Sequence, residues 1–257
     1  LKLALTVMQN MIRAHAAAYK IIHDLQPEAQ VGVALQYRGF KPATWLPTDR
    51  WMTKAFHTLF NESFPQTLKA GVFNAIFKHV SIPEALGTQD FLGLNYYTTE
   101  RLRFAPFSPG EMFAHRDFPK DAALSEMGDI ANIPQGIAES VRWGDQFGLP
   151  MIITENGLDD SQDTLRPRYI LEHLHALWKV MNGNYPVMGY FHWTLVDNFE
   201  WERGWTQRFG LWGLDLETQA RIRRPSADLY AEICQFNGIS SETIEKYAPA
   251  VMASLFP

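Results

Sequence analysis

Cysteine is nearly absent from this chain, which contains a single one, Cys234, among 257 residues. One thiol excludes an intrachain disulfide and favours a reducing compartment, so we expect a cytoplasmic location. Because Cys234 lies in the apolar stripe of a predicted late helix, we interpret it as a buried structural thiol rather than a nucleophile.

Basic charge and long apolar runs are also scarce. The formal net charge is -5, so the chain lacks the basic excess that nucleic acid or an anionic membrane surface would attract. No apolar run approaches the roughly 20 residues that cross a bilayer. The first residues run directly into an amphipathic helix, so no signal peptide is expected. We therefore expect neither nucleic acid nor a membrane as a partner.

Motifs that hold cofactors or metals are missing as well. No Gly-rich turn joins a predicted strand to its helix, which argues against a nucleotide cradle. His173 and His175 are two residues apart and lie on different faces of a helix. His15 falls on the apolar stripe of the first predicted helix and is interpreted as a core histidine. We expect no metal and no cofactor.

Aromatic side chains, in contrast, are abundant and make up 13% of the chain. Several of them stand beside acidic and amide residues rather than inside predicted strands. Aromatic faces next to hydrogen-bonding groups suit sugar rings, which have apolar C–H faces and hydroxyl rims. Core packing remains the simpler explanation for most of the phenylalanines.

Short apolar strands alternate with amphipathic helices along the chain. The predicted strands cover residues 31–35, 90–97, 151–154 and 187–192. The predicted helices cover residues 3–25, 51–78, 134–147, 165–181, 226–236 and 240–247. Residues 98–132 are expected to be irregular, and residues 209–216 to be hairpin-like.

This alternation predicts an α/β fold with parallel strands and right-handed crossovers. Four strands cannot close a (β/α)8 TIM barrel, and no strand precedes the opening helix. The simplest interpretation is that residues 1–257 are the second half of a single barrel domain and supply its last four strands and helices. An open doubly wound sheet is the rival, and the missing Gly-rich turn argues against it.

Three of the predicted strands end in polar and aromatic side chains. In chain order these are Asn95 and Tyr97, then Glu155 and Asn156, then Trp193, Glu200 and Trp201. In a barrel the carboxyl ends of the strands converge on one pocket. A carboxylate near tyrosine and amide groups, walled by indoles, suggests glycoside chemistry, which uses two carboxyl groups flanking an acetal.

Four stretches resemble motifs of the family 1 glycoside hydrolases, the β-glucosidase and β-galactosidase family. They are residues 152–157 (Ile-Ile-Thr-Glu-Asn-Gly), 90–97, 189–201, and 208–211 ahead of Asp215. Their order and spacing agree from the first helix to about Tyr230. The chain thus resembles the C-terminal half of a retaining β-glycosidase.

The resemblance assigns three residues to the reaction centre. By this resemblance Glu155 is the nucleophile that forms a covalent glycosyl-enzyme. Tyr97 donates a hydrogen bond to Glu155 and helps to keep it ionised, and Asn95 supports the same pocket.

The resemblance also implies a sugar-binding wall. Trp193 would be the floor under the sugar ring, with core packing as the alternative. Glu200 and Trp201 would bind the hydroxyls far from the anomeric carbon, and Phe209 would close that wall. A carboxylate at Glu200 accepts bonds from hydroxyls and repels phosphate, which favours unphosphorylated β-glycosides or oligosaccharides. Glucose, galactose and fucose stay open as the sugar.

One part of the family pattern is missing. The acid/base glutamate of the family lies in an Asn-Glu-Pro motif at the end of the fourth barrel strand, ahead of this chain's first helix. Residues 61–63 (Asn-Glu-Ser) lie in predicted helical material, so Glu62 is interpreted as a surface or capping residue. A complementary N-terminal half-barrel is therefore an expected partner.

The alternative is a non-catalytic half-barrel that binds carbohydrate or another chain. Residues 98–132 are expected to help select the leaving group.

Overall fold

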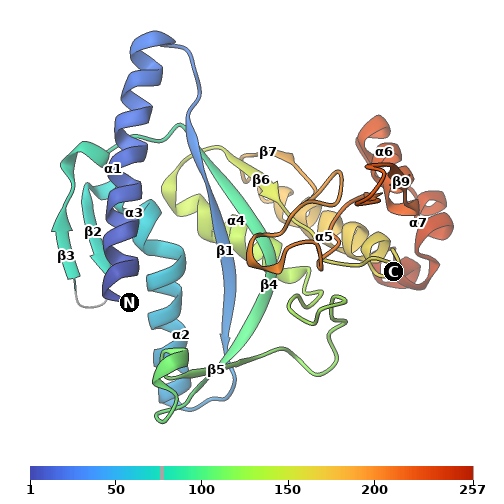
Figure 1. Ribbon diagram of the computed structural model, residues 1–257, viewed down its shortest axis with the longest axis horizontal. Coiled ribbons are helices and arrows are strands. Elements are labelled where there is room, and N and C mark those ends of the chain that lie inside the picture. The colour runs from blue at the N-terminus through green and yellow to red at the C-terminus, as the bar shows by residue number, and fades with distance from the viewer. Residues whose placement is uncertain (76–77, 257) are drawn as a thin grey trace.

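An open sheet of parallel strands runs through the middle of the computed structural model, which describes residues 1–75 and 78–256 (Figure 1). Its strands are β1 (Gly32–Pro42), β4 (Phe91–Phe104), β6 (Met151–Glu155) and β7 (Val187–Tyr190), side by side in that order. All three neighbouring pairs are parallel. The predicted α/β fold with four parallel strands is confirmed.

The side chains of β4 alternate between a face covered by a helix and a polar face, as the pleat of a strand requires. Leu94 and Tyr96 are fully buried and pack in the same apolar core as helix α4 (Gln135–Gly144). Asn95 and Tyr97 point the other way and line a polar pocket. One strand thus contributes both to the core and to the candidate site.

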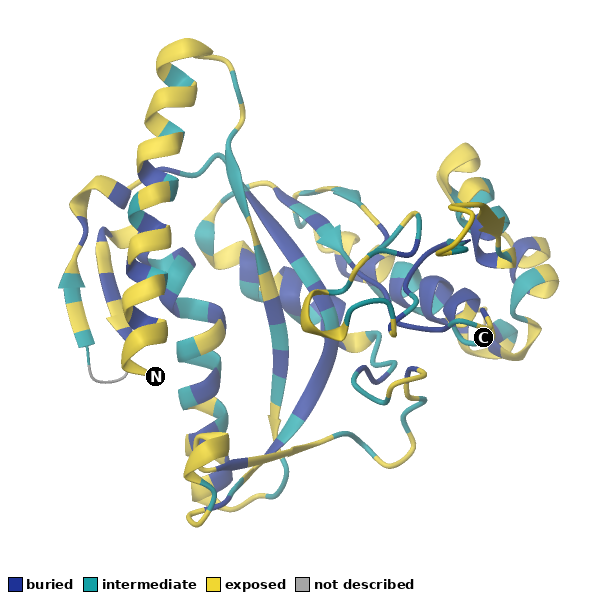
Figure 2. Cartoon of the chain, viewed as in Figure 1, coloured by how far each residue is buried: buried dark blue, intermediate teal, exposed yellow. Residues whose placement is uncertain are grey.

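Further helices pack beside this sheet and extend beyond it. The others are α1 (Lys2–Leu25), α2 (Pro47–His57), α3 (Ser63–Ala70), α5 (Arg166–Met181), α6 (Pro225–Phe236), α7 (Ser241–Tyr247) and α8 (Met252–Leu255), with a π-helical turn at Thr58–Glu62. Figure 2 shows burial concentrated along β4, whereas α1 is exposed along most of its length. Among the described residues, no helix is both long and apolar enough to cross a membrane.

The predicted helix over residues 51–78 is wrong in its second part. The helix ends at Ala70, and Gly71 follows in the left-handed conformation (φ 68°) that favours glycine at a helix end. The chain then forms strand β2 (Val72–Ala75), which pairs antiparallel with β3 (Lys78–Ser81). Phe73 and Ala75 alternate with exposed neighbours in β2, so the local period is that of a strand. Residues 76 and 77 lie outside the described part of the chain.

Strands β1 and β4 are longer than predicted. Strand β1 continues to Pro42 and β4 to Phe104, and the two pair along most of this length. A short strand, β5 (Ala114–Asp117), pairs antiparallel with the outer end of β4. Part of the region predicted to be irregular is therefore sheet. Likewise, the hairpin near residue 209 forms later, between β8 (Trp212–Leu214) and β9 (Arg221–Arg223).

The prediction of a buried Cys234 is wrong, because its side chain is exposed on α6. The core-facing positions of this helix are Ala227, Leu229 and Ile233. Cys234 follows Ile233 and is rotated by about 100° around the helix axis, away from that core.

Candidate active site

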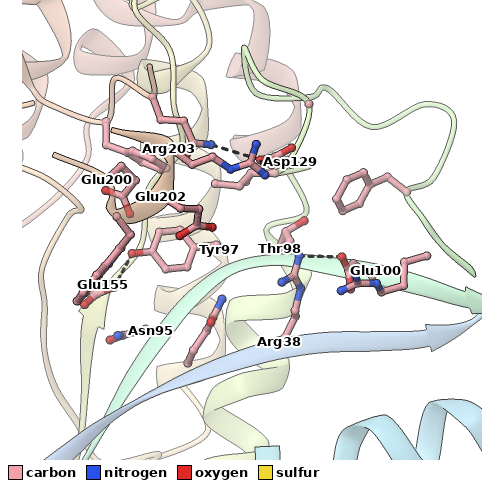
Figure 3. A pocket seen from close by; sticks show the side chains of 18 of the residues that line it. Arg38, Asn95, Tyr97, Thr98, Glu100, Asp129, Glu155, Glu200, Glu202 and Arg203 are labelled. Atoms are coloured by element: carbon pink, nitrogen blue, oxygen red, sulfur yellow. Dashed lines mark hydrogen bonds and ion pairs between the residues drawn. The ribbon is translucent and has the colours of Figure 1, made fainter. Parts of the chain in front are cut away.

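A pocket of about 700 Å³ lies at the carboxyl ends of β1, β4 and β6 (Figure 3). Six of the seven side chains to which a role was assigned line it: Asn95, Tyr97, Glu155, Glu200, Trp201 and Phe209. They come from strand ends and loops far apart in the sequence. The parallel sheet therefore brings together groups that the strand endings suggested would converge.

Glu155 is the last residue of β6, and an irregularity in the strand register turns it into the pocket. Leu94 pairs with Ile153, and the next residue, Asn95, pairs with Glu155, so that Thr154 is an extra residue in β6. Such a bulge re-aims a side chain at the end of a strand. Glu155 thereby lies beside Asn95, and both side chains line the pocket.

The hydroxyl of Tyr97 donates a hydrogen bond to Glu155 Oε2 at 2.5 Å. Burial and the nearby Glu155 charge raise the pKa of Tyr97, so its hydroxyl stays protonated and acts as the donor. Asn95 is fixed by Thr154 Oγ1, which donates to Asn95 Oδ1 at 2.5 Å. Hydrogen bonds from Tyr97 and Asn95 to the carboxylate favour its charged form.

Burial acts against ionisation of the same carboxyl group. It raises the pKa of Glu155 above its ordinary value, and the negative charge of Glu200 adds to the increase. The hydrogen bonds from Tyr97 and Asn95 only partly offset this effect. Glu155 is thus a carboxyl group whose protonation depends on its two neighbours on β4.

A buried network supports the position of Glu155 from behind. The Asn156 amide donates to the backbone oxygen of Tyr96 at 2.7 Å and to the hydroxyl of Tyr169 at 2.9 Å. The Tyr169 hydroxyl donates in turn to the backbone oxygen of Tyr97, also at 2.9 Å. Tyr190 donates to Asn156 Oδ1. Sequence reasoning missed Tyr169 and Tyr190, whose local patterns are those of ordinary core residues.

Gly157 lets the end of β6 approach the segment after β7. A Cβ atom on Gly157 would lie 1.9 Å from the backbone oxygen of Trp193, closer than any real contact. The backbone amide of Trp193 also donates to the backbone oxygen of Asn156 at 3.0 Å. Glycine is therefore required here by close packing of two backbones.

The four residues assigned to the sugar-binding wall occupy different environments. Glu200 is half-buried and accepts a bond from Asn198 at 2.8 Å. Phe209 is buried, with its ring 6.3 Å from that of Tyr97. Trp201 is 80% exposed. Trp193 packs against the cluster that contains Phe209, and it is not among the described residues that line the pocket.

Asp197 anchors the loop that carries Glu200. Its buried carboxylate accepts from the Gly210 amide at 2.8 Å and forms an ion pair with Arg224 at 2.9 Å. The Arg224 guanidinium also donates to the Gly210 oxygen. This arrangement ties the loop after β7 to the start of α6 and so fixes the loop whose Glu200 lines the same pocket as Glu155.

Glu62 lies outside the pocket, at the end of the π-helical turn. It accepts a bond from Thr58 Oγ1 at 2.9 Å and lies 3.5 Å from His57 Nε2. The adjacent Asn61 is buried and bonds to the backbone of Arg38. Residues 61–63 therefore support β1. Within residues 1–75 and 78–256, no group of three or more His, Cys, Asp or Glu side chains could hold a metal ion.

The sheet and its pocket define a class of protein: part of a (β/α)8 barrel with its polar site at the carboxyl ends of the strands. Residues 1–239 match the family model described as Glycosyl hydrolase family 1, so the chain belongs to this family. The resemblance stated from the four motifs is thereby confirmed.

Two curated relatives and two solved structures illustrate the match. A β-galactosidase of Pyrococcus woesei is 32% identical, over 92% of this chain and 52% of the relative. β-Glucosidase A of Thermotoga maritima is 30% identical, over 92% of this chain and 57% of the relative. The structure of a β-glycosidase from Pyrococcus horikoshii superposes with a TM-score of 0.85 at 32% identity, covering 94% of this chain and 56% of that one. The T. maritima β-glucosidase in complex with glucoimidazole gives a TM-score of 0.81 at 27% identity, with 90% and 56% covered.

The chain spans about half the length of the curated relatives it matches. Its four parallel strands accordingly form half of the eight-stranded barrel of the family.

Proposed function

We propose that this chain carries the nucleophile of a retaining β-glycosidase that hydrolyses unphosphorylated β-D-glycosides. In this mechanism Glu155 attacks the anomeric carbon, the bond to the leaving oxygen breaks, and a covalent glycosyl-enzyme forms. Water then cleaves the glycosyl-enzyme and regenerates the carboxylate. We also propose a cytoplasmic location, on the ground of the single cysteine.

The observation that carries the proposal is the 2.5 Å hydrogen bond from Tyr97 to Glu155 at the bottom of the shared pocket. A nucleophilic carboxylate must be ionised and held in a fixed direction, and a tyrosine donor supports both. Glu200 supplies acceptors in the same pocket for sugar hydroxyls and an unfavourable charge for a phosphate. The T. maritima relative named above forms a complex with glucoimidazole.

The second carboxyl group of the reaction is proposed to lie on the strand that precedes α1 in a complete barrel. Retaining enzymes place their two carboxyl groups ~5–5.5 Å apart. A complementary N-terminal half-barrel would supply this acid/base. The residues encoded ahead of Leu1 provide a direct check, since a strand ending in Asn-Glu-Pro is expected there.

The nucleophile is tested on the natural protein that contains this chain, at its full encoded length. A 2-fluoro glycoside with an activated leaving group should label Glu155, as peptide mass spectrometry would show. Glu155→Gln should abolish turnover, whereas Glu62→Gln, outside the pocket, should leave it unchanged. A label on any other residue would refute the assignment.

A second candidate function is a non-catalytic half-barrel that binds carbohydrate or a complementary chain. The observation that favours it is a run of exposed apolar side chains at the β7 end, namely Met188 (72% exposed), Phe191 (61%), Leu195 (64%) and Phe199 (60%). Apolar surface of this kind marks contact sites. If this polypeptide alone hydrolyses glycosides with poor leaving groups at normal rates, the non-catalytic interpretation is wrong.

A further inference from the structure

A second groove lies along helix α6, away from the pocket at the strand ends. Its volume is about 660 Å³, within the range of ~300–1,000 Å³ that is typical of small-molecule sites. It is lined by a stripe of α6 from Asp228 to Phe236, by Arg223 at the end of β9, and by Lys246 and Tyr247 of α7. None of the described residues that line this groove also lines the other pocket. Figure 1 shows α6, α7 and β9 grouped together at a distance from β1.

The α7 side of the groove lies beyond the part of the chain that matches the family. The match ends at residue 239, whereas α7 covers Ser241–Tyr247. Ile244 of this helix is fully buried and packs in the same cluster as Leu229 of α6, which fixes one helix against the other. The groove is therefore a defined feature of this chain that the family match does not include.

The charged side chains of the groove form ion pairs, so that the groove has no excess of either charge. Arg223 pairs with Asp228 across the first turn of α6. Lys246 Nζ lies 3.3 Å from Glu232 Oε2 and so connects α7 with α6. The remaining cation, Arg224, belongs to the buried ion pair described above.

Aromatic rings fix the directions of the two exposed cations. The Arg223 guanidinium lies 5.5 Å from the centre of the Trp212 ring, and Lys246 Nζ lies 4.5 Å from the centre of the Tyr247 ring. The side chains of Arg223 and Lys246 are nevertheless 53% and 62% exposed, so a ligand can reach them. A guanidinium, an ammonium and a carboxylate each have more hydrogen-bonding positions than one ion pair uses. Groups that are already oriented lose less entropy when a ligand binds.

Phe236 gives the groove an apolar surface. Its ring is 70% exposed at the end of α6. Gln235, also exposed, lies beside it in the lining and supplies amide donors and an acceptor. An exposed ring next to hydrogen-bonding groups suits a sugar, whose C–H face packs on the ring while its hydroxyls bind the polar groups.

The composition of the lining argues against other classes of ligand. An anion would be repelled by Asp228 and Glu232, and a cation by Arg223 and Lys246. A docked helix needs apolar contacts over successive turns, whereas most of these lining side chains are charged or polar. An apolar small molecule would remove water from the ion pairs without replacing its hydrogen bonds. A neutral ligand with many hydroxyls satisfies donors and acceptors alike.

We propose that the groove between α6 and α7 is a second, non-catalytic binding site for a neutral oligosaccharide. Phe236 packs against a sugar ring, and Gln235 and the two ion pairs bind its hydroxyls. The site needs no contribution from Glu155, so it goes beyond the proposed glycosidase function and does not depend on it.

Hydrogen–deuterium exchange with mass spectrometry tests the site on the full-length natural protein. The protein carries Glu155→Gln, so that a sugar probe is not turned over. Cellotetraose or maltotetraose, as neutral probes, should slow exchange in peptides from residues 225–247. The probe concentration that gives half of the maximal protection measures the affinity.

Two substitutions at exposed positions of the groove should weaken this protection. Phe236→Ala should raise the half-maximal concentration by about 10-fold or more, as is usual for an aromatic residue central to an interface. Gln235→Ala should raise it by about 2-fold to 10-fold, the effect of one neutral hydrogen bond.

Phe107→Ala is the matched control, because Phe107 is 95% exposed and lines neither the groove nor the pocket. It should leave the half-maximal concentration unchanged. Equal effects of Phe236→Ala and Phe107→Ala would overturn the site. So would a lack of protection at residues 225–247 by both neutral probes. Tetragalacturonic acid, an acidic probe, should protect less well, and tighter binding of this acid would show an anion site instead.

Peptides that contain residues 151–157 report on the other pocket in the same experiment. Protection there without protection at residues 225–247 would refute the groove alone. Protection at residues 225–247, together with failure of the 2-fluoro glycoside to label Glu155 in the wild type, would refute the glycosidase proposal and leave the groove in place.

Discussion

At the scale of single residues, Glu155 is subject to opposing electrostatic influences. Burial and the charge of Glu200 favour its neutral form, and hydrogen bonds from Tyr97 and Asn95 favour the anion. The role of nucleophile that we propose for Glu155 requires the anion, so in that role its two neighbours on β4 would set the lowest pH at which the carboxyl group can react. Removing one donor should therefore be visible in a pH profile.

Tyr97→Phe removes the stronger of the two donors without changing the ring. The pKa of Glu155 should rise further, because the hydrogen bond that lowers it is lost. The acidic limb of the labelling rate by a 2-fluoro glycoside should move to higher pH. On that limb the rate should fall by roughly 10-fold, the effect of one hydrogen bond to a charged group.

Tyr96→Phe is the control for this prediction. Tyr96 is the preceding residue of β4, faces the helices, and donates to the backbone oxygen of Ile133 at 2.7 Å. Its loss should reduce stability and leave the pH profile of labelling in place. If both variants shift the profile equally, Tyr97 does not act through Glu155.

The raised pKa of Glu155 also predicts how stability depends on pH. A carboxyl group with a raised pKa binds its proton more tightly in the folded chain than in the unfolded chain. The free energy of unfolding therefore decreases as the pH rises from the pKa of Glu155 in the unfolded chain, about 4.5, through its pKa in the folded chain. The loss is complete above the folded pKa.

Glu155→Gln should remove this loss. The variant should be at least as stable as the wild type at neutral pH, and the difference between them should vanish in acid, where both side chains are neutral. Urea unfolding of the two chains at a series of pH values measures the difference. A variant that is less stable than the wild type at neutral pH would contradict the assigned direction.

At the scale of elements, the junction of β6 with the segment after β7 depends on close backbone contact. A methyl group at Gly157 would meet the Trp193 backbone oxygen at 1.9 Å, and a backbone atom cannot move aside as a flexible side chain can. Gly157→Ala should lower the free energy of unfolding by about 1–3 kcal/mol, the usual cost of overpacking. Urea denaturation measures this loss.

Gly189→Ala is the matched substitution, because Gly189 lies on the adjacent strand β7 and a Cβ atom there would meet nothing within 4 Å. It should be tolerated within about 0.5 kcal/mol, as is usual for sites without such a contact. Equal losses in the two variants would show that contact with Trp193 is not the cause.

The sequence predicted these elements well where the local pattern is sufficient and poorly where it is not. Glu155 was recognisable because a polar group ends a short apolar run. Arg38 and Glu100, which also line the pocket, were not predicted from the sequence. They lie where β1 and β4 continue past their apolar parts, and these extensions are held by the pairing of β1 with β4 and of β4 with β5. The pairing of β1 with β4 joins residues about 60 positions apart, as does the ion pair between Arg38 and Glu100. No local window contains this information.

The site assignments show the same limit. The strand endings indicated that Asn95, Tyr97 and Glu155 would converge, and the structure places them in one pocket. The side of the backbone on which an indole lies is not encoded by its neighbours in sequence. Trp193, expected as a floor of the pocket, packs in one cluster with Tyr97 and Phe209, which themselves line the pocket, and its place under a sugar ring stays a prediction.

At the scale of the whole molecule, both ends of the parallel sheet expose apolar side chains. At one end α1 presents Leu3 (77% exposed), Met11 (57%) and Ile21 (59%), and at the other Phe191 and Leu195 follow β7. Strands β1 and β7 each pair on one side only within the described sheet. Unpaired edges and apolar surface together favour association, and in a barrel further strands would cover both ends.

The half-barrel therefore predicts a particular pattern of activity for this polypeptide alone. A leaving group with a low pKa departs without a proton, so 2,4-dinitrophenyl glycosides should transfer their sugar slowly to Glu155. Alkyl glycosides and disaccharides, whose leaving oxygens need a general acid, should not react measurably. A slow release of dinitrophenolate, absent in Glu155→Gln and accompanied by a covalent mass increase on Glu155, is the expected result. Azide, which attacks without a general base, should accelerate turnover of the glycosyl-enzyme. Normal rates on disaccharides would instead place the acid/base within residues 1–257 and contradict the assignment of that group to another half.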